Sequence, residues 1–291
     1  MLRRLAPLPL LLVTLAFAAP ACAQDPAPTS PQFDPGQDVP SESHALAATI
    51  ISNTTSLHSQ IDTWRSTADT TVGSSPLEVT NRSTFHQRLQ LRLAQSPRLF
   101  RRVVRLLPPK LAADARDIYV AQRSLRRVAG GSARRIRYGA SLPAGRLLSL
   151  YGKAQARFGI RKRILAAINL VETRFNRLRN TSSAGAQGPM QFMPATWRMY
   201  GMGGNIRDPG DAILGAGNYL RASGAPRNYR RALYAYNHSR LYVEAVARYS
   251  RMIGRDPHSF YVLHSWHLFT GSGPTFRRLT GPEPRRLVVA P

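Results

Sequence analysis

The sequence predicts an all-α protein in which one helical domain follows a helical accessory region. Three observations support this fold class. Apolar residues recur at helical spacing, as Phe85, Leu89 and Leu93 do at i, i+4 and i+8. Residues typical of helix starts precede apolar runs, as in Ser96-Pro97, where Ser is a good N-cap and Pro suits the first helical position. Long alternation of apolar and polar residues, which is typical of strands, does not occur before residue 259.

Residues 1–23 are predicted to form a secretory signal peptide. Arg3 and Arg4 precede an apolar run that ends at Ala19, and Ala21-Cys22-Ala23 forms an A-x-A cleavage pattern. This run is too short to cross a bilayer comfortably, and no later segment is long enough. We therefore expect an exported protein of the cell wall, the periplasm or the extracellular space, without a transmembrane segment in the mature chain. The alternative is a lipid anchor at Cys22, although the residues before it lack the Leu usual at such sites.

Cys22 is the only cysteine in the sequence, which excludes an intrachain disulfide and a thiolate metal site. The seven histidines are scattered, and the neighbours His264 and His267 alone provide too few ligands for zinc. A phosphate-binding glycine loop is also missing from the sequence. We therefore expect no metal and no cofactor.

The chain is strongly basic, with 41 Lys and Arg against 15 Asp and Glu and a formal net charge of +26. Such a charge attracts polyanions, and an exported protein meets anionic wall polymers, peptide-stem carboxylates and anionic lipid headgroups. The alternative is a coding bias, because only Lys110, Lys153 and Lys162 are lysines. We expect no nucleic-acid partner, since basic motifs with interleaved aromatic residues are missing.

Two regions precede the second helical domain. Residues 24–43 are rich in Pro, Ser, Asp and Gln and predict a disordered linker. Residues 44–137 predict a helical accessory region, because apolar stripes follow one another along it. These stripes are typical of packing faces, so we assign the region no chemistry. Gly130-Gly131 and the basic run that follows mark its end.

Residues 141–256 are predicted to form the second helical domain, followed by a C-terminal tail at 257–291. Ser141-Leu142-Pro143 opens one helix of the domain, and the next spans Arg161 to Phe175 with its apolar residues on or near one face. Within the tail, the segment 259–270 fits either a short strand or a helix.

Glu172 is the first candidate for chemistry. It ends the run Ala166-Ala167-Ile168-Asn169-Leu170-Val171, so its carboxyl group is expected in apolar surroundings. Such surroundings disfavour the charged form and raise the pKa of Glu, as a general acid near neutral pH requires. Taken alone, a Glu on a helix is more often a solvated surface residue.

A block rich in small residues follows the Glu172 helix, from Ser182 to Trp197. Small residues at 184–186 and 188 allow close approach to the backbone. Gln191 offers two donors and an acceptor, which suit an acetamido or hydroxyl group. Met190 and its apolar neighbours offer an adaptable wall for a ligand. The alternatives are a simple turn for the small residues and core packing for the apolar ones.

Three motifs in order resemble the soluble lytic transglycosylase family. They are Glu172-Thr173-Arg174-Phe175-Asn176, the block Ser-x-Ala-Gly-Ala-x-Gly-x-Met-Gln-x-Met-Pro-x-Thr that begins at Ser182, and Ala235-Tyr236-Asn237. The resemblance covers about residues 141–254. Arg177 stands where the family commonly has Pro, and Pro189 stands where Leu is frequent. Neither departure touches Glu172, so they affect loop shape more than chemistry.

The resemblance implies a lysozyme-like helical fold and an enzyme that cleaves the β-1,4 bond between N-acetylmuramic acid and N-acetylglucosamine in peptidoglycan. It makes Glu172 the single catalytic acid and base, and peptidoglycan strands the substrate. Ser182 would lie near that Glu, and Met190, Gln191, Tyr236 and Asn237 would line the sugar cleft. We expect the protein to act as a monomer.

Ordinary glycosidases use two carboxylates, and acids are scarce after Glu172. Asp208-Pro209-Gly210-Asp211 is best interpreted as the start of a helix, with Asp208 as N-cap. A missing second carboxylate fits a substrate-assisted route in which the N-acetyl group stabilises the sugar cation and a 1,6-anhydro ring closes. One alternative is a lysozyme-type hydrolase, with Asp208 or Asp211 reaching the cleft. Another is a wall-binding module without activity.

Overall fold

The computed structural model describes residues 32–128, 137–267, 269–270 and 277–278. The predicted all-α fold is confirmed over these residues, because helices dominate and the two strands hold two residues each. The predicted signal peptide and Cys22 lie outside the described residues. The helices are α1 (Ser43–Thr67), α2 (Leu77–Gln95), α3 (Pro97–Leu106), α4 (Pro109–Val128), α5 (Ala144–Phe158), α6 (Lys162–Thr173), α7 (Pro194–Tyr200), α8 (Pro209–Ala222), α9 (Tyr229–Tyr236), α10 (Arg240–Arg255) and α11 (Pro257–His264). Strand β1 (Phe269–Thr270) pairs antiparallel with β2 (Arg277–Arg278).

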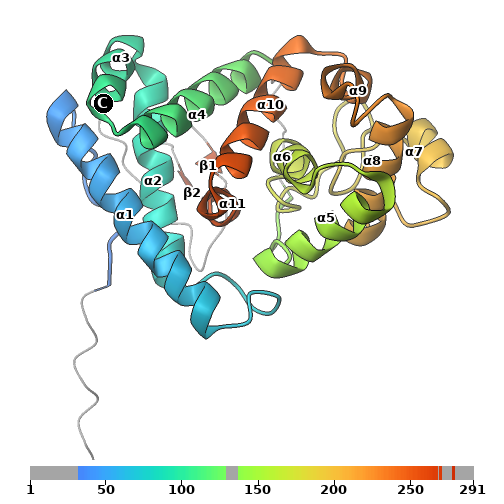
Figure 1. The fold of residues 1–291 in the computed structure, drawn as a ribbon, viewed down its shortest axis with the longest axis horizontal. Helices are drawn as coiled ribbons and strands as arrows, with labels where there is room; N and C mark the ends of the chain where they lie inside the picture. The colour runs from blue at the N-terminus through green and yellow to red at the C-terminus, as the bar shows by residue number, and fades with distance from the viewer. Residues whose placement is uncertain (1–31, 129–136, 268, 271–276, 279–291) are drawn as a thin grey trace, which may run out of the picture. The chain divides into compact units, whose positions relative to one another are not determined.

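Helix α6 carries Glu172 and is the most deeply buried helix near the site. Its residues from Ile164 to Leu170 are all buried, which explains why the segment contains almost only Ala, Ile and Leu. Figure 1 shows α6 between α5 and α10, and it packs against both. The only polar side chain in this buried stretch is Asn169. The helix therefore runs from the buried core to its last turn, where Glu172 is partly exposed.

The predicted accessory region shares a core with the domain that follows it. Ile61 of α1 and Ile118 of α4 belong to the same buried cluster as Ile168 of α6 and Tyr249 of α10. A second, smaller cluster lies within the accessory region and is built around Leu46, Phe85 and other buried side chains of α1–α4. Residues 44–128 are thus attached to the rest of the chain through apolar packing.

Helix α10 joins the two regions, because it packs against α4 on one side and α6 on the other (Figure 1). Charged side chains reinforce the contact with α4. Arg255 bonds to Asp114 and, at 2.6 Å from Nη2 to Oδ2, to Asp117. Arg248 also reaches Asp117, at 3.3 Å. Since both aspartates are largely buried, these pairs are less screened than surface ion pairs.

The start of the described chain differs from the predicted disordered linker. Phe33 packs edge-on against Phe85, with ring centroids 5.6 Å apart. Arg88 donates to the carbonyls of Pro35 and Gln37, both at 2.6 Å. These contacts fix residues 33–39 against α2, although their Pro-rich composition resembles that of a flexible segment.

Helix α11 (Pro257–His264) forms the start of the predicted tail, and residues 259–266 are buried. Phe260 and Leu263 lie in the main core, and Trp266 follows them there. Of the two alternatives for the segment 259–270, a helix is formed up to residue 264, and β1 follows at 269–270.

Asp256 caps α11 and gathers side chains from distant helices. It accepts from the backbone N–H of His258 at 2.9 Å, and Lys110 lies 2.7 Å from its Oδ2. The His58 ring stacks on the His258 ring, with centroids 4.2 Å apart. Burial opposes ionisation of Asp256, yet the bonds from Lys110 and His258 outweigh it and lower its pKa to about 2. The histidines scattered in the sequence are in this case brought together by the fold.

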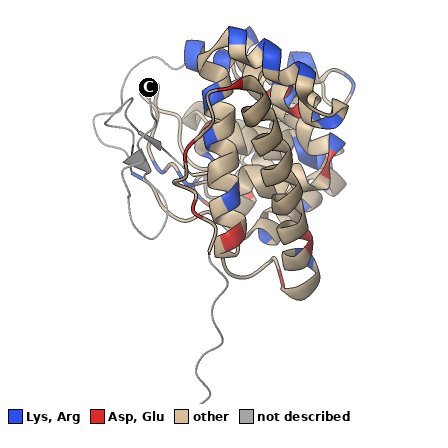
Figure 2. Ribbon diagram, turned by 90° about the vertical axis from the view of Figure 1, so that its left-hand side faces the viewer, with Lys and Arg blue, Asp and Glu red and all other residues tan. Residues whose placement is uncertain are grey.

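The basic residues are spread over several helices rather than confined to one (Figure 2). Helices α3 and α4 are notably basic, and their exposed arginines are Arg98, Arg101, Arg102, Arg105, Arg116, Arg123, Arg126 and Arg127. The described helices include none with the length and apolar character needed to span a membrane.

Because Ile61 is completely buried in the shared core, we expect Ile61→Ala to destabilise the whole chain by about 2–5 kcal/mol. Thermal unfolding followed by circular dichroism should show one transition at a lower temperature. Val72→Ala is the matched control, because Val72 is 64 % exposed and its truncation should change little. Two separate transitions, with the second one unmoved, would contradict a shared core.

Candidate active site

Glu172 occupies the last turn of α6, where the apolar helix meets a polar loop. Burial raises the pKa of its carboxyl group to about 7, and a hydrogen bond from Tyr242 acts in the opposite direction. The Glu172 residue nevertheless keeps partial solvent exposure. A carboxyl group with this pKa is available in both its protonated and its ionised form near neutral pH.

Tyr242 is the direct partner of Glu172. Its hydroxyl donates to Glu172 Oε1 at 2.6 Å, and the Tyr242 side chain is itself buried in the first turn of α10. Ser239 caps this turn by accepting from the Tyr242 N–H at 3.3 Å. The pKa of Tyr242 is raised by burial and by the neighbouring Glu172, so its hydroxyl remains a donor.

The chain reverses sharply after α6 through three consecutive residues with positive φ. Arg174, Phe175 and Asn176 have φ values of 52°, 58° and 67°. This left-handed conformation is unfavourable for residues with side chains and usually marks functional sites. Phe175 anchors the turn, because its ring is fully buried and its N–H donates to Asn169 O at 3.1 Å.

A buried polar network ties α6 to the loop that follows. Tyr151 of α5 donates to Asn169 Oδ1 at 2.7 Å. The Asn169 amide and the Thr173 hydroxyl both donate to the carbonyl of Pro189, at 2.9 and 2.7 Å. Thr173 Oγ1 also accepts from the Asn176 N–H at 3.0 Å. The network therefore holds the left-handed turn and the 182–192 loop against the helix that carries Glu172.

The predicted site residues Ser182 and Gln191 shape this loop. Ser182 Oγ accepts from the Ala186 N–H at 2.9 Å and closes a short turn. Gln191 Nε2 donates to the carbonyls of Asn180 and Gly188, at 3.2 and 3.0 Å. Gly188 has φ of 74°, and a Cβ atom there would collide with the carbonyl of Ile206. Both side chains are partly exposed while they make these loop contacts.

Met190 and Tyr236 are brought together, but not in the way that the sequence predicts. The Met190 side chain is fully buried in the main core, so it does not form a surface wall open to ligand. Its carbonyl accepts from Tyr236 Oη at 2.7 Å. The Tyr236 hydroxyl is therefore engaged by the loop backbone rather than by Glu172. Burial and then the nearby Glu172 raise the pKa of Tyr236.

Aromatic rings surround Tyr236. Phe192 and Tyr219 lie 5.7 and 5.6 Å from it between centroids, and Trp197 packs edge-on against Phe192 at 5.1 Å. Asn237 follows Tyr236 as the C-cap of α9 and is partly exposed. Helices α7, α8 and α9 therefore meet around the 182–192 loop through their aromatic residues.

Asp208 and Asp211, the carboxylates considered for a second catalytic role, are engaged elsewhere, as is the neighbouring acid Glu244. Asp208 is the N-cap of α8, as the sequence predicts, and accepts from the Asp211 N–H at 2.9 Å. Asp211 accepts from the Asn205 N–H at 2.8 Å. Glu244 pairs with Arg248 on α10 at 2.5 Å.

Tyr242, Asn169 and Thr173 are the residues of this site whose contacts the sequence did not predict. Asn169 and Thr173 carried a signal, because polar residues in an otherwise apolar helix need buried partners. Tyr242 lies at a buried position of α10, and a buried phenol usually finds a hydrogen-bond partner. The sequence alone does not identify that partner, because Glu172 is 70 residues away.

The family comparison agrees with this geometry. Residues 149–255 match the family model described as "Transglycosylase SLT domain". The match contains Glu172, the 182–192 loop and Tyr242, and it confirms the resemblance and the lysozyme-like helical fold expected for this part of the chain. No curated protein and no solved structure matches the chain.

We expect Thr173→Val to lower the free energy of unfolding by about 1–3 kcal/mol, because it removes a buried hydroxyl that serves both Pro189 and Asn176. Urea unfolding measures this change. Thr181→Val is the control, since Thr181 is exposed on the same loop. Equal stability of the two variants would exclude the structural role of the Thr173 hydroxyl.

We expect Tyr242→Phe to raise the pKa of Glu172 above about 7, because the lost hydrogen bond stabilises the carboxylate form. An NMR titration of the labelled Glu172 carboxyl carbon measures the shift directly. Tyr219→Phe is the matched control, because the Tyr219 hydroxyl donates to the carbonyl of Ala235 instead. A lower pKa in Tyr242→Phe would mean that Tyr242 does not stabilise the carboxylate.

Proposed function

We propose that the protein is a peptidoglycan lytic transglycosylase, because residues 149–255 match the family model of the transglycosylase SLT domain. It cleaves the β-1,4 bond between N-acetylmuramic acid and N-acetylglucosamine and leaves a 1,6-anhydromuramoyl end. The observation that carries this proposal is Glu172, a carboxyl group with a pKa of about 7 at the end of a buried helix, inside the matched domain. An acid in this state donates a proton readily and can accept one back.

In the proposed reaction, the Glu172 carboxyl group gives its proton to the glycosidic oxygen as the bond from this oxygen to C1 breaks. The substrate's own N-acetyl carbonyl stabilises the positive charge that develops at C1. The Glu172 carboxylate then takes the proton of the C6 hydroxyl, whose oxygen bonds to C1 and closes the anhydro ring. Glu172 ends protonated, as it began, and no water is consumed.

The chain's own residues are suited to both halves of this cycle. Tyr242 holds one carboxyl oxygen at 2.6 Å and stabilises the carboxylate formed after the first step. The Asn169 and Thr173 network fixes the backbone around the acid, which limits the reorganisation needed during reaction. Ser182, Gln191 and Asn237 are partly exposed in the same domain, and we assign them to the sugar cleft.

A lysozyme-type hydrolase is the second candidate, and it needs a carboxylate that activates water. Asp208 accepts from the Asp211 N–H at the start of α8, and Asp211 accepts from the Asn205 N–H in the loop before it. Both carboxylates are therefore occupied, which favours the single-acid route. A wall-binding module without activity is the third candidate, and the raised pKa of Glu172 favours catalysis over it.

The proposed substrate also determines where the protein would work. We propose that it is exported by its N-terminal signal and acts on the glycan strands of the wall as a monomer. Its basic surface would then contact anionic wall polymers through Coulomb attraction that weakens with salt.

In a gel impregnated with peptidoglycan, we expect wild type to clear the substrate and Glu172→Gln to lose the activity by at least about 100-fold, since the amide cannot supply a proton. Glu244→Gln is the matched control, because Glu244 lies in the same domain, paired with Arg248. Equal clearing by wild type and Glu172→Gln, or none by either, would reject the proposal. Mass analysis then separates the two enzymes: anhydro ends, one water lighter, identify the transglycosylase, and reducing ends identify the hydrolase.

A further inference from the structure

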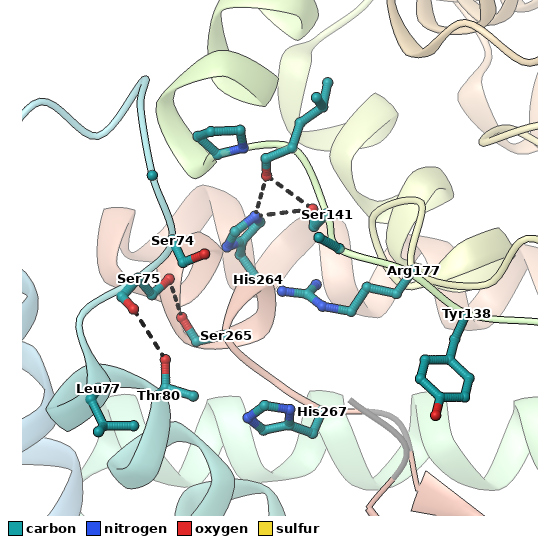
Figure 3. Close-up of a pocket in the computed structure, with 15 residues that line it drawn as sticks. Ser74, Ser75, Leu77, Thr80, Tyr138, Ser141, Arg177, His264, Ser265 and His267 are labelled. Carbon is teal, nitrogen blue, oxygen red and sulfur yellow. Dashed lines mark hydrogen bonds between the residues drawn. The ribbon is translucent and has the colours of Figure 1, made fainter. Parts of the chain in front are cut away.

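A cavity of about 520 Å³, whose lining does not include Glu172, lies between the accessory region, the segment before α5 and the C-terminal end of α11. Four segments that are distant in the sequence line it: residues 73–80, residues 138–143, Arg177, and residues 264–267 (Figure 3). A volume of this size suits a small ligand or one end of a larger one.

Arg177 provides the formal positive charge of this cavity. Figure 3 shows its guanidinium group directed into the space toward His264. Its Nη1 donates to the carbonyl of Arg174 at 3.2 Å, which uses one of five N–H groups. Burial, and then the neighbouring Arg174, lower the pKa of Arg177 to about 10, so it stays charged at neutral pH. The fifteen lining residues contain no Asp or Glu.

Several of the other lining side chains carry hydroxyl groups. Ser141 Oγ lies 3.2 Å from His264 Nε2, which also lies 2.9 Å from the carbonyl of Leu142. Burial and the charge of Arg177 lower the pKa of His264 to about 3, so this ring is neutral. Ser265 donates to Ser75 Oγ at 3.0 Å on the opposite wall. Pro143, which precedes the first residue of α5, also lines the cavity and brings the positive end of that helix dipole to it.

We propose that this cavity binds an oxyanion, a carboxylate or a phosphate group, through the guanidinium of Arg177. Burial of a cation without an acidic neighbour costs the free protein desolvation energy. A carboxylate or phosphate group offsets this cost, because its oxygens accept paired N–H bonds from the guanidinium group. The hydroxyl groups of Ser141 and Thr80 donate to the carbonyls of Leu142 and Ser75, at 3.0 and 3.4 Å, so the anion relies on the guanidinium group of Arg177.

The two sources of such a group are the free carboxylates of wall peptide stems and phosphate-bearing compounds. The peptide source rests on the proposed function, because the enzyme would meet peptide stems along the strand that it cleaves.

Calorimetric titration of the full chain tests the site. The parent is the wild-type chain, because none of the probes contains a glycosidic bond and binding is therefore measured apart from catalysis. The probes are a synthetic stem peptide with free carboxylates, the same peptide with its carboxylates amidated, and inorganic phosphate. The variants are Arg177→Gln, Arg177→Lys, and Arg198→Gln as the control, since Arg198 is an exposed arginine on α7.

We expect the free-acid peptide or phosphate to bind the parent and Arg198→Gln equally. Binding should be at least about 10-fold weaker in Arg177→Gln. It should be intermediate in Arg177→Lys, which keeps the positive charge but lacks the paired N–H donors of a guanidinium group. If the acid peptide binds and its amidated form does not, the source is the wall peptide. If phosphate alone binds, the source is a phosphate compound. No binding of either anion, or equal binding by Arg177→Gln, overturns the proposal.

Thermal unfolding without ligand separates binding from a purely structural role. Arg177→Gln should unfold at the same temperature as the parent or higher, because it removes an uncompensated buried charge. The bound anion should raise the unfolding temperature of the parent and not that of Arg177→Gln. Two results together would reject the site. The unfolding temperatures of ligand-free Arg177→Gln and Arg177→Lys would fall markedly, and the anion would stabilise neither the parent nor the variants. Arg177 would then be a packing residue. A failed gel assay with intact anion binding would reject only the proposed function.

Discussion

The removal of one carboxyl group from water is the constraint on which the rest of this structure depends. Glu172 stands near the end of α6, whose residues 164–170 are buried, and the burial of its own carboxyl group raises its pKa to about 7. Near neutral pH, the ionised and the protonated forms of this carboxyl group are therefore about equally stable, so it can donate or accept a proton. The helices around α6, the left-handed turn after it and the polar network at Pro189 all serve to keep the group there.

The accessory region contributes to this constraint from a distance. Tyr242, which touches Glu172, lies in the first turn of α10, and Arg255 at the end of α10 bonds to two aspartates of α4. The same helix therefore contacts the acid at one end and the accessory region at the other. Since Ile61 and Ile118 also enter the main core, residues 44–128 are structural support for the matched domain.

The helices were predictable because their signals are local. Periodic apolar residues and caps such as Ser96 and Asp208 depend on neighbours within one or two turns. The burial of the Glu172 carboxyl group was predictable from the apolar run that precedes it. The bond from Tyr242 and the packing of Phe33 were not, because each depends on residues brought together by the fold from far along the chain. Composition likewise predicted disorder for residues 33–39, whereas Arg88 donates hydrogen bonds to two of their carbonyls and holds this segment in place.

Helix α10 has a mechanical consequence. The Cα atoms of Tyr242 and Arg255 are separated by thirteen residues, or roughly 20 Å along a rigid rod at 1.5 Å per residue. A tilt of this rod by a few degrees about its clamped end displaces its far end by an ångström or more, which is enough to stretch a 2.6 Å bond beyond its useful range. The proton affinity of Glu172 therefore depends on the contacts that hold the Arg255 end of α10 against α4.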